Sequence, residues 1–196
     1  WHTRDFGTKW LICETYLKHW PANMWVQTPL ELLERMIDEH GFGMTDIARV
    51  RTSPHVPFIT ENYAQTARGS LDAQFSIPYC LTAYLMDPHP GAHWFTDEMR
   101  NDAELIAFTG RFEHFGETRT PQDNFNEFKQ GEFPLVRLEI TLNDGRELVG
   151  EMRYPKGHPK NNFTWEEEAA HFRLCCPPYM SADRIEKIIV GVRTLE

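Results

Sequence analysis

The sequence predicts one α+β domain, in which an antiparallel sheet carries helices packed on one side. Three observations predict this fold class. Several segments with helical periodicity carry their own capping residues, two alternating segments joined by a tight turn read as a β-hairpin, and no repeat or low-complexity linker divides the 196 residues. A chain of this length is long enough to bury a sizeable core.

For three of the expected helices, capping or stop residues in the sequence mark the ends. Thr28 to Glu31 form a capping box with proline at the first helical position, and Gly41 follows the apolar stripe as a stop signal. A second capping box, Thr164 to Glu167, predicts a helix that ends before Pro177. Ser181 is the expected cap of a third helix, which runs towards the end of the chain.

A fourth helix is predicted in residues 72–86, DAQFSIPYCLTAYLM. Pro78 lacks an N–H and cannot lie deep inside a helix, so we expect Ser76 as N-cap and a helix that runs to Met86. Tyr79 then lies in the first turn, at the positive end of the helix, where anions are favoured. Two interpretations stay open at this point, a tyrosine packed in the core and a tyrosine that faces a ligand.

The strands are predicted from apolar and polar residues that alternate with a period of two. Residues 135–142 alternate apolar and polar side chains, 143–146 (NDGR) form a tight turn, and 147–154 return as the second strand of a hairpin. Residues 46–53 are a third strand candidate. We expect a helix over 101–112 and irregular structure over 54–70 and 112–134.

Composition excludes several classes of function. Twenty basic against 29 acidic residues give a formal net charge of −9, which argues against a nucleic-acid or anionic-membrane partner. No apolar run approaches the roughly 20 residues that span a bilayer. The four cysteines match neither a zinc pattern nor a disulfide framework, which is typical of a reducing cytosol, so we expect a cytoplasmic protein.

Local motifs for catalysis are scarce. The sequence has no glycine-rich phosphate loop, no HExxH and no nucleophile elbow. His89 and His93 are four residues apart, but Pro88 and Pro90 keep them from sharing a helical face, so no metal site is expected there.

Three longer segments are more informative when taken together. They are residues 16–36 (YLKHWPANMWVQTPLELLERM), 72–87 (DAQFSIPYCLTAYLMD) and 154–161 (YPKGHPKN), the last followed by a capped helix. In this order they resemble the MmgE/PrpD family, which includes 2-methylcitrate dehydratase, cis-aconitate decarboxylase and iminodisuccinate epimerase. The resemblance runs from about Gly7 to the end of the chain.

The resemblance implies that the active site is formed by two domains, of which this chain is one. Members of the family have a large helical N-terminal domain followed by a smaller α+β lid domain, with the active site in the cleft between them. Residues 1–196 resemble the lid domain alone, and much of the acid–base chemistry is implied to come from histidines of the absent helical domain. The chain by itself is therefore expected to be inactive. Relatives also imply a homodimer, with neither a metal nor an organic cofactor.

The implied reaction is proton abstraction next to a carboxylate of a small di- or tricarboxylate. Dehydration, decarboxylation or epimerisation would follow, and a reaction similar to that of 2-methylcitrate dehydratase is favoured. Tyr79 matches the cleft tyrosine of the family and is the candidate catalytic residue, while Lys18 matches a lysine that could bind a carboxylate as a point charge. Asn23 and Gln27 are candidate substrate-binding residues. Asn23, like Trp25, stands where relatives carry other groups, and an amide cannot transfer a proton at neutral pH.

Two alternatives remain open beside this interpretation. Lys18 could be an ordinary surface lysine, as most lysines are. The altered residues and the missing partner domain also suit a non-catalytic ligand-binding or regulatory domain derived from the same fold.

Overall fold

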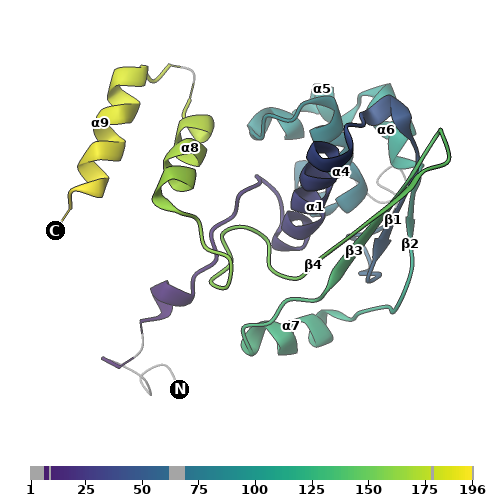
Figure 1. Cartoon of the computed structure of the whole chain (residues 1–196), viewed down its shortest axis with the longest axis horizontal. Coiled ribbons are helices and arrows are strands. Elements are labelled where there is room, and N and C mark those ends of the chain that lie inside the picture. The colour runs from purple at the N-terminus through teal and green to yellow at the C-terminus, as the bar shows by residue number, and fades with distance from the viewer. Residues whose placement is uncertain (1–6, 9, 62–68, 178, 196) are drawn as a thin grey trace.

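The structure is a computed structural model that describes residues 7–8, 10–61, 69–177 and 179–195 (Figure 1). Within these residues it has eight α-helices and a four-stranded sheet, so the predicted α+β fold is confirmed. The long helices α1 (Met24–His40) and α4 (Ile77–Met86) pack against each other, and α1 lies on one face of the sheet. No helix in this part of the chain combines the length and the apolar character that a bilayer span requires.

The sheet is mixed rather than purely antiparallel. Its strand order is β2–β1–β3–β4, with β1 at Ile47–Ser53, β2 at Phe112–His114, β3 at Val136–Leu142 and β4 at Glu147–Met152. The predicted hairpin is confirmed, and β1 also pairs antiparallel with β3. The antiparallel prediction is wrong for β2, which runs parallel to β1 because the chain between them crosses over through helices.

The two faces of the sheet differ in polarity. Along β3, alternate residues from Val136 to Leu142 are buried beneath the helices. The opposite face carries ion pairs, in which Glu139 accepts from Arg51 of the neighbouring strand β1 at 2.9 Å and from Arg137 of its own strand at 2.8 Å. Helices on one side and charges on the other match the period of two in the sequence.

Most of the predicted helix ends are confirmed. Ser76 caps α4 by accepting from the Tyr79 amide at 3.2 Å. The capping box from Thr164 to Glu167 opens α8 (Trp165–Cys175), and Ser181 caps α9 (Ala182–Arg193). Gly41 ends α1 in the left-handed conformation at φ 63°, which glycine adopts without strain.

The start of α1 differs from the prediction. The helix begins at Met24, because the Asn23 side chain accepts from the Trp25 amide at 3.0 Å and so acts as the N-cap. Pro29 then lies inside the helix rather than at its first position. The capping-box signal at 28–31 was therefore overridden by an earlier cap.

The expected irregular regions also contain regular structure. Residues 112–134 hold β2 and the capped helix α7 (Pro121–Lys129), and the expected helix at 101–112 is the shorter α6 (Ala103–Thr109). Residues 62–68 of the other expected irregular stretch lie outside the described residues. The remaining elements are η1 (Leu11–Glu14), η2 (Met44–Asp46), α3 (Ser70–Phe75), η3 (Ala92–Phe95) and α5 (Asp97–Arg100).

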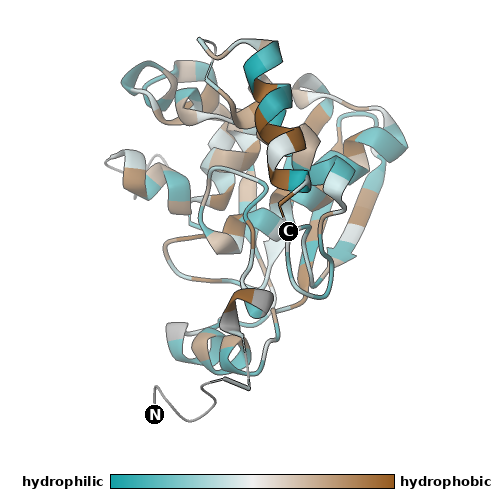
Figure 2. Ribbon diagram, turned by 90° about the vertical axis from the view of Figure 1, so that its left-hand side faces the viewer, coloured by the Kyte–Doolittle hydropathy of each residue, from teal (hydrophilic) through white to brown (hydrophobic). Residues whose placement is uncertain are grey.

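The C-terminal helices α8 and α9 stand apart from the sheet (Figure 1). The N-terminal segment 10–20, here called the strap, runs along the same side of the molecule as these helices. Figure 2 shows this side facing the viewer, with α9 in front. The space between the strap, α1 and α8 is where the candidate site lies.

Candidate functional site

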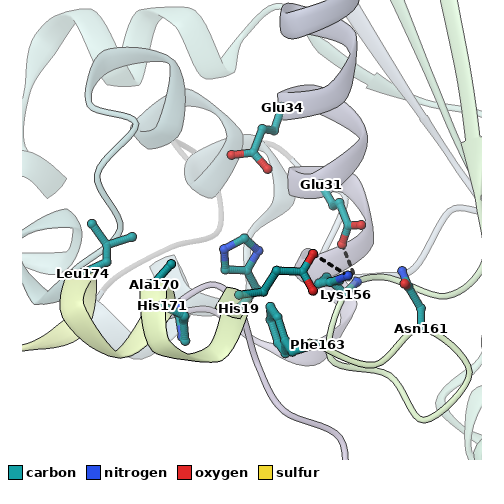
Figure 3. A pocket seen from close by; sticks show the side chains of 10 residues that line it. His19, Glu31, Glu34, Lys156, Asn161, Phe163, Ala170, His171 and Leu174 are labelled. Atoms are coloured by element: carbon teal, nitrogen blue, oxygen red, sulfur yellow. Dashed lines mark hydrogen bonds and ion pairs between the residues drawn. The ribbon is translucent and has the colours of Figure 1, made fainter. Parts of the chain in front are cut away.

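Two of the three segments that carry the family resemblance line one cavity of about 460 Å³. Residues 16–36 supply His19 from the strap and two glutamates from α1, residues 154–161 supply a lysine and an asparagine, and α8 closes the other side (Figure 3). Segment 72–87 reaches the wall through Tyr84, whose hydroxyl donates to Glu34 at 3.4 Å. The lining residues are His19, Glu31, Glu34, Lys156, Asn161, Phe163, Glu167, Ala170, His171 and Leu174.

Gln27 is buried and fastens the turn that presents His19. Its amide nitrogen donates to the carbonyls of Trp20 at 3.0 Å and Ala22 at 3.1 Å, and its oxygen accepts from the Trp20 amide at 2.9 Å. The strap is thereby tied to the first turns of α1 by one side chain. Gln27 has a structural task, and its burial leaves no surface for the predicted contact with substrate.

Asn23 also forms hydrogen bonds within the domain. Its side-chain oxygen caps α1, and its backbone N–H donates to the Gln74 carbonyl at 2.8 Å. The structure thus uses this residue to join the start of α1 to the end of α3. A substrate contact from Asn23 would have to use its amide nitrogen, and it stays a prediction.

The prediction that Tyr79 faces a cleft is wrong. Its side chain is 0% exposed, and its hydroxyl donates to the backbone carbonyl of Trp94 in η3. The ring also stacks with Phe95 at a centroid distance of 6.0 Å. Its amide does lie at the capped start of α4, as expected, but the side chain turns into the core because η3 supplies a buried acceptor there.

Lys18 is exposed on the strap, one residue before His19. The strap is held at this point by a hydrogen bond of 3.0 Å from the Leu17 amide to the Gly157 carbonyl. This bond joins the first and the third of the resembling segments directly. Lys18 is therefore accessible at a fixed point of the backbone, and its role in binding a carboxylate stays a prediction.

His19 lies in the middle of the cavity (Figure 3). Burial, and next the His171 ring at a centroid distance of 5.2 Å, lower the pKa of His19 from its ordinary 6.5 to about 4. The Nδ1 atom is buried and has no hydrogen-bond partner among the described residues. The imidazole is therefore neutral at physiological pH, with one ring nitrogen unused within the described part of the domain.

The two glutamates of α1 have environments that favour the protonated form. Burial raises the pKa of Glu31, although its carboxylate accepts from the Lys156 amide. Burial, and then the nearby Asp38, raise the pKa of Glu34. A neutral imidazole beside carboxyl groups with raised pKa is the kind of set that can move protons.

Lys156, the lysine among the described residues that line the cavity, forms an ion pair. Lys156 contacts Glu167 at 2.7 Å, and the pKa of Glu167 falls to about 2 because of this bond and of the bond from the Thr164 amide. The pair joins the 154–161 loop to the first turn of α8. Carboxyl groups outnumber ammonium groups in this lining, so the cavity is acidic when all of them are ionised.

The described residues contain no group of three or more His, Cys, Asp or Glu side chains arranged to hold a metal ion. His89 and His93, which share a spacing of four, both contact Asp87, at 3.0 and 3.2 Å. Their ring nitrogens thus meet the two oxygens of one carboxylate in the loop after α4.

Sequence reasoning missed the groups that form the cavity. His19 and Lys156 lie inside the resembling segments but were not singled out, and Glu31 was interpreted only as part of a capping box. His171 carried no local signal, because only the folded chain brings α8 beside the strap. The one sequence relation that linked a cavity residue to a predicted site residue is that Glu31 follows Gln27 by four positions, which places both on the same side of the helix.

Residues 20–196 match the family described as the MmgE/PrpD C-terminal domain. The match begins two residues after Lys18, so Lys18 and His19 lie just outside it. No curated protein matches the chain. Because the match covers most of the chain, the protein belongs to the MmgE/PrpD family, to its C-terminal domain.

Proposed function

We propose that this chain is the C-terminal domain of an enzyme that abstracts a proton next to a carboxylate of a small di- or tricarboxylate. Loss of water or carbon dioxide, or reprotonation, would complete the reaction, and a substrate similar to 2-methylcitrate is the first choice. The observation that supports the proposal is that two separate family segments line one cavity and that the third contacts its lining residue Glu34 through Tyr84. The cavity contains groups suited to proton transfer.

In this proposal the domain supplies part of the proton-transfer machinery. Neutral His19 offers its unpartnered Nδ1 as a proton or hydrogen-bond acceptor, and Glu34 offers a carboxyl group whose pKa is raised. Tyr84 orients Glu34 from α4. The remaining groups would come from the N-terminal domain of the same enzyme, across the open side of the cavity.

The acidic lining limits how an anionic substrate could bind. A substrate carboxylate would meet Lys156 in the wall, whose ammonium Glu167 already neutralises, and the exposed Lys18 beside His19 on the strap is the other cation proposed to bind it. Binding of an anion beside Glu31 and Glu34 would favour protonation of one of them, in the direction that their raised pKa values already indicate. Exposed Lys18 therefore becomes the main cation for recognition.

The test is steady-state kinetics of the full-length enzyme with 2-methylcitrate, cis-aconitate and iminodisuccinate. Lys18→Met should raise KM by about ten- to a hundredfold, the worth of one charge-assisted contact, with a smaller change in kcat. Lys129→Met, which removes an exposed lysine on α7, is the matched control and should leave KM unchanged. An equal KM in both variants would remove Lys18 from the site.

A second candidate is a non-catalytic binding or regulatory domain. The observation that favours it is that Asn23, Gln27 and Tyr79 all have structural tasks within the domain. Binding of a carboxylate without turnover by the full-length protein would select this alternative. Turnover of any of the three acids would exclude it.

A further inference from the structure

A second cavity, of about 650 Å³, lies between helix α7, the strap and the 154–161 loop. We call it the α7 cavity, and Figure 1 shows α7 at the lower edge of the molecule, away from α9. Its volume falls within the range of about 300–1,000 Å³ that is common for small-molecule sites. Among the described residues none lines both this cavity and the candidate site, so the two are separate spaces.

Aromatic rings form much of the wall of the α7 cavity. Phe125 and Phe128 of α7, Phe133 of the following turn and Tyr16 of the strap all line it. The rings of Phe128 and Phe133 meet edge to face at a centroid distance of 4.8 Å, and Tyr16 lies 5.6 Å from Phe133. Phe125 is still 52% exposed, so its ring has surface left to cover. Rings in such arrangements favour a further flat ring, stacked with an offset or placed edge to face.

His158 supplies one polar group to this aromatic wall. It lines the cavity although its side chain is only 4% exposed, and its Nδ1 accepts from the Lys160 amide at 3.0 Å. Burial, and then the nearby Lys160, lower the pKa of His158 below its ordinary 6.5, so the ring is neutral at physiological pH. Because Nδ1 is an acceptor, the proton of the neutral ring lies on Nε2. No acceptor for this N–H lies among the described residues.

The polar groups beside His158 limit the chemistry of the ligand. The ammonium of Lys160 pairs with Glu132 and donates to the Tyr154 hydroxyl at 3.0 Å, so an anion would have to compete with this pair. A purely aliphatic ligand would bury the Nε2–H of His158 without a partner, which is costly. A neutral ligand with an oxygen acceptor meets both limits.

We propose that the α7 cavity binds a planar aromatic ligand that carries a carbonyl oxygen. The ring of the ligand packs among the phenylalanines, and its oxygen accepts from the Nε2–H of His158. The inference does not depend on the proposed function, since it uses no residue that lines the candidate site. The ligand would contact the 154–161 loop, which also supplies residues to the candidate site.

The test is isothermal titration calorimetry of the full-length protein with coumarin, a planar aromatic lactone. We expect a Kd of about 1 mM or lower, as for a small ligand that uses most of its atoms. Cyclohexanone, which has a carbonyl but no aromatic ring, is the control ligand and should bind at least about tenfold more weakly. Saturating tricarballylate, an unreactive tricarboxylate, should leave the Kd of coumarin unchanged, because the two cavities are separate.

Two matched pairs of variants assign the contacts. In His158→Asn the shorter side chain can still accept from the Lys160 amide but does not reach the place of Nε2, so the Kd of coumarin should rise about five- to tenfold. His158→Gln restores a donor near that place and should stay within about threefold of the unmodified protein. Phe125→Leu should raise the Kd about threefold, whereas Phe75→Leu, at a 40% exposed position on α3, should not change it.

Three results would overturn the proposal. Absence of coumarin binding up to about 10 mM would show that the cavity does not accept this class of ligand. An unchanged Kd in both His158→Asn and Phe125→Leu would place any bound coumarin elsewhere. Competition by tricarballylate would show that the α7 cavity is part of the carboxylate site. Phe125 is half exposed, so its variant should fold even where a change of His158 destabilises the loop. None of these readouts uses activity, so a wrong substrate class would leave the test intact.

Discussion

Tyr79 and Tyr84 lie on the same helix and have opposite surroundings. The Tyr79 hydroxyl donates to the Trp94 carbonyl inside the core, whereas the Tyr84 hydroxyl donates to Glu34 at the cavity wall. Burial and the Glu34 carboxylate both raise the pKa of Tyr84, which keeps its proton on the phenol at neutral pH. Of these two tyrosines of α4, it is Tyr84 that contacts a residue lining the candidate cavity.

Tyr79→Phe separates a core role from a catalytic one, since it keeps the ring and removes only the hydroxyl. The buried Trp94 carbonyl would lose its donor, so the free energy of unfolding should fall by about 1–3 kcal/mol. Urea unfolding measures this loss, and the turnover rate of the full-length enzyme should stay within about twofold. A roughly hundredfold or larger loss of turnover, which is the worth of a positioned acid or base, would restore the catalytic role of Tyr79.

His19 makes the stability of the folded domain depend on pH. The unfolded chain protonates this residue near pH 6.5 and the folded chain near pH 4, so between these values the unfolded state binds more protons and acidification destabilises the fold. The raised pKa values of Glu31 and Glu34 act in the opposite direction. A comparison with His19→Gln isolates the histidine from them.

The expected loss of stability of the unmodified chain between pH 6.5 and 4 exceeds that of His19→Gln by roughly 1–2 kcal/mol. This difference in free energy is smaller than the full pKa shift would give, because the His19 side chain is only partly buried. Urea titrations of both proteins at a series of pH values measure it. Parallel stability curves would mean that His19 titrates normally in the fold.

Among the elements, those whose ends are fixed by local residues were predictable. Ser76, Thr164 and Ser181 cap helices through bonds to residues three positions ahead, and such bonds can be read from the sequence. The hairpin of β3 and β4 was equally legible, because a tight turn fixes its register.

Elements that depend on distant partners were not predictable in the same way. Helix α1 begins early because Asn23 is held by Gln74 and because Gln27 ties down the preceding turn. Strand β2 runs parallel to β1 only because the intervening helices return the chain to the same end of the sheet. Neither cause is visible in a window of neighbouring residues.

For the molecule as a whole, the resembling segments indicated the region of the candidate cavity, but most of the side chains that line it were not singled out from the sequence. Two of the three family segments line one cavity and the third contacts it through Tyr84, yet two of the four predicted site residues, Gln27 and Tyr79, turn inward. Which way a side chain points depends on tertiary acceptors such as the Trp94 carbonyl. The groups that line the cavity, His19 and Glu34 among them, became apparent only when the strap, α1 and α8 were seen together.

The central claim is that this cavity, completed by an N-terminal domain, binds the carboxylate substrate. A crystal structure of the full-length enzyme with an unreactive tricarboxylate tests it most directly. We expect one carboxylate of the ligand within about 3.5 Å of the ammonium of Lys18 or Lys156, and a ligand atom within hydrogen-bond distance of His19 Nδ1. A ligand bound elsewhere, with no contact to the strap or to the 154–161 loop, would contradict the account.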